Sequence, residues 1–181
     1  MKIGVMMHCT DLAIAPAELA VAAEERGYES IFVTEHTHIP VRSFIRWRDG
    51  EPMPEEYKRL YDPIVVLATA AAVPSTIEIG TGVLVLAQRE PLATAKQLAS
   101  LDVLSGGRVI LGAGVGWLEA EFRAVGVSMT DRGARMDENL DVLRACWSED
   151  PITFKGRWHD LDAVRLLPQP ARPIPIWIGG G

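Results

Sequence analysis

Two segments of the sequence place histidine directly after a short apolar run, where a buried strand is expected to end. Met7-His8-Cys9 follows the first run and Glu35-His36-Thr37-His38 follows the second. Imidazole and carboxylate groups can exchange protons near neutral pH, and histidine also binds divalent metals. Because the other expected strand ends supply no His, Asp or Lys, the pattern favours acid–base chemistry, and we predict no metal site.

Glycine is concentrated at three further strand ends. Gly82, within Thr81-Gly82-Val83, indicates a bulge or the close approach of another group. Residues 112–116 (GAGVG) begin like a dinucleotide-binding fingerprint, but Trp117 stands where a small residue is needed. Gly179-Gly180 could present backbone N–H groups to a phosphate. Together with the histidines, these ends predict a pocket for a flat, phosphate-bearing ligand.

Apolar runs of strand length alternate with helical segments along the chain. Pro16, Pro63 and Pro91 each open a helical pattern, in the position that proline favours. Buried parallel strands joined by helices fit either an open doubly wound sheet or a (β/α) barrel, and both bind ligands at the carboxyl ends of the strands. The expected strands are 2–7, 30–34, 77–86, 109–113 and 176–178; further helices are expected at 118–125 and after Thr130 or Asp131, with a small antiparallel excursion at 152–167.

The composition is that of one soluble globular domain covering residues 1–181. Apolar residues make up 48% of the chain, which is enough to form a core, and the net charge of −6 argues against a nucleic-acid partner. No stretch approaches the ~20 apolar residues of a membrane span, and the first residues do not resemble a signal peptide. Cys9 and Cys146 lie far apart, so we expect reduced thiols, a cytoplasmic location and no membrane partner.

Five segments follow one another along the chain: Glu35-His36, TGVLVL at 81–86 with Pro91, KQLASLDVLSGGRVILGAGVGWLEAEF at 96–122, DRGARMDENL at 131–140, and LLPQP with PIPIWIGGG at 166–181. In this order they resemble the luciferase-like monooxygenase superfamily, and within it the branch of probable coenzyme F420-dependent oxidoreductases. The resemblance covers nearly the whole chain. Its most specific part is KQLASLDVLSGGRVILGAGVGWLEAEF at residues 96–122.

This resemblance implies a (β/α)8 TIM barrel, of which the chain supplies about the first five βα units, with a deazaflavin or flavin at the carboxyl ends of the strands. It also implies a non-prolyl cis peptide at Gly82-Val83, next to Thr81, that supports the ring. His36 would lie near the reactive ring edge, and Glu35 stands where relatives often have Asp. The remaining implied cofactor contacts are Gly116 and Trp117 beside the cofactor and Gly179 and Gly180 at its phosphate.

The activity implied by the resemblance is F420-dependent oxidoreduction, with hydride transfer between C5 of the deazaflavin and an unknown small organic substrate. His36 and Glu35 are the expected catalytic residues, with His36 as general acid–base. Two alternatives stay open, namely an FMN-dependent monooxygenase and a non-catalytic, flavin-binding or subunit-forming partial barrel. Half a barrel has two unpaired sheet edges, so we expect the chain to be the N-terminal part of a longer protein, with pairing of the edges between two copies as the less favoured explanation. A homodimer or higher homo-oligomer is the expected assembly.

Residues outside the strand ends receive smaller roles. His8, Trp47 and Tyr61, with Tyr57, are candidates for the wall of the substrate pocket. Arg42, Arg46 and Arg48 fit a solvated surface better than a ligand site. Some relatives place Glu at the end of the fourth strand, but Val115 occupies that region here, so that acid role is not carried over. Glu121 and Glu138 are expected on helix surfaces, and Trp147 is expected in the core with Met136, Leu140 and Leu143.

Overall fold

The computed structural model describes residues 2–41, 52–73 and 75–179. Trp47, Gly180 and the three arginines at 42, 46 and 48 lie outside these residues, so their predicted roles stay predictions. No helix in the described part of the chain is both long enough and apolar enough to cross a membrane.

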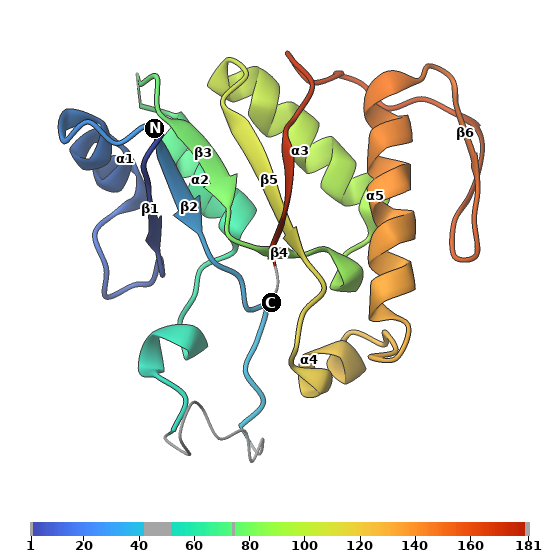
Figure 1. Cartoon of the computed structure of the whole chain (residues 1–181), viewed down its shortest axis with the longest axis horizontal. Coiled ribbons are helices and arrows are strands. Elements are labelled where there is room, and N and C mark those ends of the chain that lie inside the picture. Colours follow the sequence, from blue (N-terminus) through green and yellow to red (C-terminus); the bar gives the residue numbers. More distant parts are fainter. Residues whose placement is uncertain (1, 42–51, 74, 180–181) are drawn as a thin grey trace.

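A six-stranded parallel sheet forms the centre of the molecule (Figure 1). Strand β5 lies between β3 and β4 on one side and β8 on the other, and β1 follows β2 at the far edge. Within the described residues, β1 and β8 have no second partner, so the sheet is open, and it matches the first strands of the predicted barrel. The strands are β1 Gly4–Met7, β2 Ser30–Val33, β3 Glu78–Thr81, β4 Leu84–Val85, β5 Val109–Gly114 and β8 Ile176–Gly179.

Helices connect the parallel strands and cover one face of the sheet (Figure 1). They begin where the sequence predicted, because proline occupies the first position of α1, α2 and α3. Asp62 and Glu90 then cap α2 and α3 by accepting hydrogen bonds from backbone N–H groups of the first turn. The α-helices are α1 Pro16–Glu25, α2 Pro63–Ala71, α3 Pro91–Ser105, α4 Glu119–Ala124 and α5 Arg132–Ser148; the 3-10 helices are η2 Glu55–Lys58 and η3 Leu86–Gln88.

In place of the predicted strand 77–86 the structure has two strands, and the peptide bond between Gly82 and Val83, which lies between them, is cis. Strand β3 ends before this bond, and β4 resumes after it, still paired with β5. The chain then turns into η3. The single long strand was therefore wrong, whereas the irregularity predicted at Gly82-Val83 is confirmed.

The core lies between the sheet and its helices. Met136, Leu140 and Leu143 on α5 are buried as predicted. Trp147 is only half-buried and donates its indole N–H to the Ala95 carbonyl of α3, 3.1 Å away. The indole therefore both packs and bonds, which explains its position at the edge of the apolar face.

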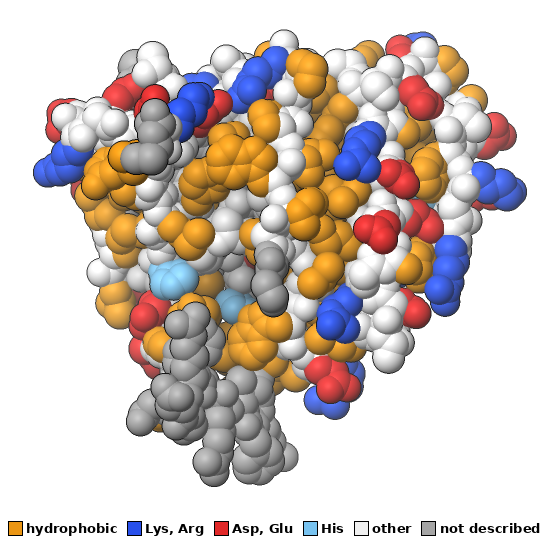
Figure 2. All heavy atoms as spheres, in the orientation of Figure 1, with side chains coloured by type: hydrophobic (Ala, Val, Ile, Leu, Met, Phe, Trp, Pro, Cys, Tyr) orange, Lys and Arg blue, Asp and Glu red, His pale blue; other side chains and the backbone are white. Residues whose placement is uncertain are grey.

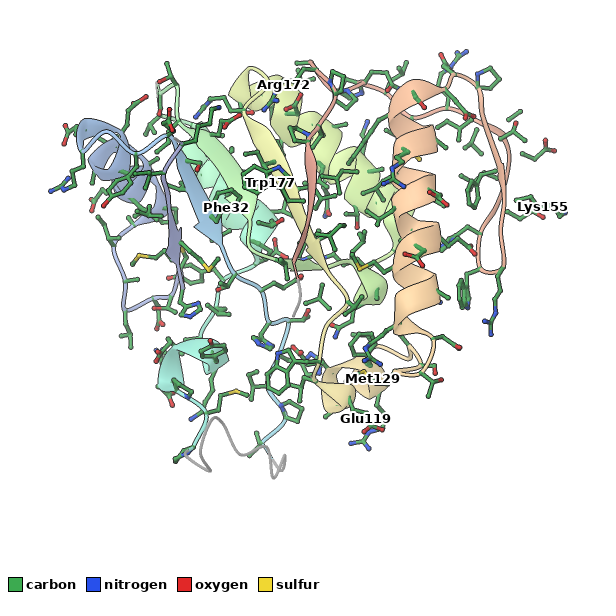
Figure 3. The ribbon with its side chains drawn as sticks, in the orientation of Figure 1. Phe32, Glu119, Met129, Lys155, Arg172 and Trp177 are labelled. Carbon is green, nitrogen blue, oxygen red and sulfur yellow. The ribbon has the colours of Figure 1, made fainter. Side chains whose placement is uncertain are left out.

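The opposite face of the sheet exposes hydrophobic side chains (Figure 2). Met6 and Trp177, which lie on this face, are more than half exposed. Phe32 and Trp177, from β2 and β8, stack with ring centroids 5.3 Å apart across this face (Figure 3). In a closed barrel, this face would be the packed interior.

A hairpin of β6 Ile152–Lys155 and β7 Asp160–Val164 forms the predicted antiparallel excursion. It is held against α5 by Glu138, whose carboxylate accepts hydrogen bonds from the backbone N–H groups of residues 157, 158 and 159. The His159 ring nitrogen Nδ1 lies 3.0 Å from the same carboxylate. The prediction of Glu138 as a helix-surface residue was wrong, because the hairpin turn covers its carboxylate.

Candidate active site

A cleft with a volume of about 560 Å³ lies at the carboxyl ends of the parallel strands. Histidine side chains reach the surface at this end of the sheet (Figure 2). Segments from β1, β2, the β3–β4 break, β5 and β8 meet there, and η2, α4 and α5 close the sides. Its lining residues are His8, Thr34, Glu35, His36, Tyr57, Gly82, Val83, Val85, Gly114, Val115, Gly116, Trp117, Glu121, Met129, Arg132 and Gly179.

The cleft brings together most of the predicted site residues from distant parts of the chain. Two described residues of the predicted set do not line it. Thr81 is buried beneath it and donates its hydroxyl to the Gly112 carbonyl at 2.7 Å. Tyr61 lies instead in a separate shallow pocket with Asp11, Lys58 and Arg59. Tyr57, on η2, takes the aromatic place in the cleft that Tyr61 was expected to share.

His36 forms a buried pair with Glu121. Its ring nitrogen Nδ1 lies 3.0 and 3.1 Å from the two carboxylate oxygens, and the two side chains are only 7% and 3% exposed. With a carboxylate as acceptor, Nδ1 carries the proton and donates it. The other ring nitrogen, Nε2, is then an acceptor. This is the arrangement by which a carboxylate orients a histidine that acts as a base.

Glu121 is the site residue that the sequence analysis missed. It was expected on a helix surface, yet α4 turns it inward beside the fully buried Phe122. A signal was present, since Leu118, Glu121 and Phe122 stand three and four positions apart and therefore share one helix face. The two apolar members of that face are buried, so the acid between them is buried as well.

Aromatic rings surround the two histidines of the cleft. Tyr57 lies with its ring centroid 4.8 Å from that of His8 and 5.6 Å from that of His36. Trp117 meets His36 edge to face at 5.9 Å. The Nδ1 atom of His8 lies 2.7 Å from the Thr34 hydroxyl. These contacts hold both imidazoles in place in the cleft.

Glu35 lines the cleft, but its carboxylate is bonded to Val85 and Arg89, which with Asp62 form what we call the wall of the cleft. One carboxylate oxygen accepts the backbone N–H of Val85 at 2.5 Å, and the other accepts the guanidinium of Arg89, whose Nε lies 2.9 Å away. Arg89 also pairs with Asp62 at 3.0 Å. Burial alone would lower the pKa of Arg89, but the Glu35 and Asp62 carboxylates raise it above its ordinary value. Glu35 thus fastens β4 to the end of β2, and its direct contact with a ligand stays a prediction.

The glycines of the cleft make room for neighbouring side chains. A Cβ atom on Gly114 would stand 2.5 Å from one methyl group of Val83, and a Cβ on Gly179 would stand 2.5 Å from the other. Gly116 has a positive φ of 77°, and a Cβ there would meet Val85 and Phe122. The three glycines therefore seat the β3–β4 segment, with Val83 over the end of β5 and the end of β8. Contact of Gly179 with a phosphate stays a prediction.

No group of three or more residues suited to hold a metal ion occurs in the described parts of the chain. His36 faces Glu121 in the cleft, whereas His38 is absent from the cleft lining. The two histidines that alternate in sequence are thus not brought together in the cleft.

Known proteins are similar to this chain over nearly its whole length. The model of the family described as luciferase-like monooxygenase matches residues 15–181. An uncharacterised protein of Mycobacterium tuberculosis is 34% identical over 183 residues, which are 99% of this chain but 65% of that protein. The F420-dependent glucose-6-phosphate dehydrogenase of Kineococcus radiotolerans is 33% identical over 171 residues, covering 91% of this chain and 46% of the relative.

Among solved structures, the monooxygenase RslO1 from Streptomyces bottropensis is similar over 98% of this chain and 53% of its own. The TM-score is 0.80 and the sequence identity is 29%. The chain therefore spans between about half and two thirds of the length of the proteins it matches.

Proposed function

The chain belongs to the luciferase-like monooxygenase family, and from that membership and the cleft we propose that it supplies the active-site half of an F420-dependent oxidoreductase. The reaction is hydride transfer between C5 of the deazaflavin and a small organic substrate. The observation that carries this proposal is the buried His36–Glu121 pair, which lies in the cleft at the carboxyl ends of the strands.

The described residues fit a flat, ring-shaped cofactor. The cleft volume lies within the range of about 300–1,000 Å³ that small-molecule sites occupy. Val83 and the glycines at 82, 114 and 116 would hold one side of the ring system, and Trp117 would lie beside it. The phosphate of the cofactor would lie at the end of β8, beside Gly179. When bound, the deazaflavin would supply the two-electron acceptor or donor.

The protein itself supplies proton transfer and orientation. A substrate alcohol that loses a hydride from carbon must also lose its hydroxyl proton. The Nε2 atom of His36 is the acceptor for that proton, because Nδ1–H is already donated to Glu121. Glu121 also stabilises the imidazolium that forms. In the reverse direction, the same imidazolium returns the proton to the carbonyl oxygen.

An FMN-dependent monooxygenase is the second candidate. It is supported by the similarity to RslO1, which is called a monooxygenase. The same cleft residues would hold the flavin ring. The third possibility, a non-catalytic partial barrel, is supported by the open edges β1 and β8 among the described strands.

We also propose that the chain self-associates, because the exposed sheet face with Met6, Phe32 and Trp177 is apolar. Analytical ultracentrifugation of the 181-residue chain tests this point. A monomer at micromolar concentration would contradict it.

Titration of the purified chain with F420 and, separately, with FMN tests the main proposal, with cofactor and Trp fluorescence as readouts. Selective binding of F420 is the expected result. Selective binding of FMN would favour the second candidate, and binding of neither would overturn a cofactor role for this chain. A His36→Asn variant serves as a control, because it should bind the cofactor within about twofold of the original chain.

A further inference from the structure

Arg132 brings a positive charge into the cleft, and no acidic side chain of residues 2–41, 52–73 or 75–179 forms an ion pair with it. It is the first residue of α5, and its side chain lines the same cleft as His36 and Trp117. One guanidinium nitrogen donates to the Met129 carbonyl at 2.9 Å. Met129 lies at the connection between α4 and α5 (Figure 3).

Most of the donors of this guanidinium are unused. Arginine carries five N–H donors, and the contact with Met129 is its only hydrogen bond in the described part of the protein. The Nε atom of Arg132 is shielded from solvent and has no hydrogen-bond partner there. Because Arg132 lines the cleft, the N–H groups at its Nη atoms that the Met129 carbonyl does not use are the donors open to a molecule bound there.

The other charged groups of the cleft are already paired. Glu35 is bonded to Arg89, and Glu121 is bonded to His36. Neither carboxylate pairs with Arg132 within the described residues. Arg135, one turn further along α5, also has an Nε without a partner among the described residues. Its guanidinium carbon lies 5.6 Å from the centroid of the Trp158 ring, and Arg135 does not line the cleft.

We infer that Arg132 binds an oxyanion, a phosphate or carboxylate group carried by the molecule that occupies the cleft. The planar guanidinium matches both groups through paired N–H···O hydrogen bonds. The inference rests on the proposed function only in taking the cleft as the ligand site. The anion has two candidate sources, namely the side chain of the cofactor and an anionic substrate.

Pairs of probes that share a ring system and differ in phosphate separate these sources. FMN and riboflavin form one pair, and F420 and its phosphate-free riboside form the other. If Arg132 binds the cofactor, Arg132→Gln should weaken binding of the phosphorylated member by about tenfold and leave the other unchanged. If Arg132 binds the substrate instead, Arg132→Gln should bind both members of each probe pair as the original chain does. In a titration with inorganic phosphate, the NMR signals of cleft residues should then shift in the original chain and not in Arg132→Gln.

Two variants make the test decisive. Arg144→Gln removes the same charge from the exposed side of α5, outside the cleft, and should have no effect on either measurement. Arg132→Lys keeps the charge and should retain part of the phosphate response, which guards against a folding defect in the glutamine variant. Unchanged binding of every probe by Arg132→Gln, or equal losses in Arg144→Gln, would overturn the inference.

The phosphate titration also separates this inference from the proposed function. A chain that binds neither F420 nor FMN would contradict the proposed function. The comparison of the original chain with Arg132→Gln in inorganic phosphate would still decide whether Arg132 is an anion site.

Discussion

Glu35 and His36 are neighbours in sequence, yet they belong to two different regions of the cleft. Glu35 belongs to the wall, where its carboxylate joins β2 to β4 through Val85 and Arg89. His36 belongs to the ligand space, where Glu121 holds one nitrogen and leaves the other as an acceptor. Glu35 pairs with Arg89 and His36 pairs with Glu121, and both pairs are largely buried. The two pairs differ in whether an atom that can transfer a proton is left free to meet a ligand.

The difference teaches how to assign roles to charged residues at a strand end. A carboxylate bonded to a backbone N–H and an arginine stabilises the fold and has little capacity left for chemistry. A histidine fixed at Nδ1 is prepared for chemistry at Nε2. Substitutions in the wall should therefore change stability first, and substitutions at His36 and Glu121 should change turnover first.

The largest expected effect is on stability, in the wall. Glu35→Ala leaves the Val85 N–H without its acceptor and Arg89 with Asp62 alone, so the free energy of unfolding should fall by about 3 kcal/mol. Urea denaturation followed by circular dichroism measures this loss. Asp62→Asn, at the exposed end of the same network, is the control and should cost less than half as much. If Glu35→Ala were as stable as the original chain, Glu35 would not stabilise the fold through its bonds to Val85 and Arg89.

The next effect is on turnover, at His36. Asparagine can keep an N–H near the position of Nδ1 and so preserve the bond to Glu121, but it lacks Nε2. His36→Asn should therefore lower kcat by about 10²-fold with little change in the free energy of unfolding. Stopped-flow absorbance of bound F420, with the fastest substrate from a panel of alcohols, measures it. A variant with normal turnover would exclude His36 as the base.

A smaller effect is expected at Glu121, which acts through His36. Glu121→Gln removes one charge-assisted hydrogen bond, worth roughly 1.5 kcal/mol, so turnover should fall about tenfold. Long-range ¹H–¹⁵N NMR should show His36 protonated at Nδ1 in the original chain and a mixture of tautomers in Glu121→Ala. If the tautomer does not change, Glu121 does not position His36.

The smallest effect concerns Glu138, which does not line the cleft and, like Glu35, accepts hydrogen bonds from backbone N–H groups. Burial alone would raise its pKa, but the N–H groups of Trp158, Arg157 and His159 hold the pKa below its ordinary value. A lowered folded-state pKa means that Glu138 stabilises the fold above about pH 4.3 and that this contribution is lost as the pH falls further.

Glu138→Gln should accordingly lower the free energy of unfolding by about 1 kcal/mol at pH 7 and flatten its dependence on pH between about 5 and 3. Turnover should stay as in the original chain, because the hairpin does not line the cleft. An equally steep pH dependence in the variant would show that another group is responsible.

Local signals in the sequence were enough to predict the elements and much of the cleft. Pro16, Pro63 and Pro91 marked the helix starts, and the glycine at 82 marked the irregular strand. Strand ends in a parallel sheet meet at one edge, so His8 and His36 could be brought together without coordinates.

Long-range partners could not be predicted in the same way. Arg89 lies 54 residues from Glu35 and Glu121 lies 85 residues from His36. Which acid meets which base depends on the tilt of α4 and the path after β4, and neither is encoded in local spacing. The choice between Tyr57 and Tyr61 likewise depends on how η2 lies against β1.

Val83, seated over Gly114 and Gly179, has a consequence for protein engineering. An added methyl group at either glycine would require the Val83 side chain to move, so the sizes of the side chains at the three positions depend on one another. Libraries that vary them one at a time should yield mostly damaged proteins. Libraries that combine alanine at position 114 or 179 with a residue smaller than valine at position 83 keep the total side-chain volume nearly constant. Such libraries should change the shape of the cleft floor while the chain keeps its fold.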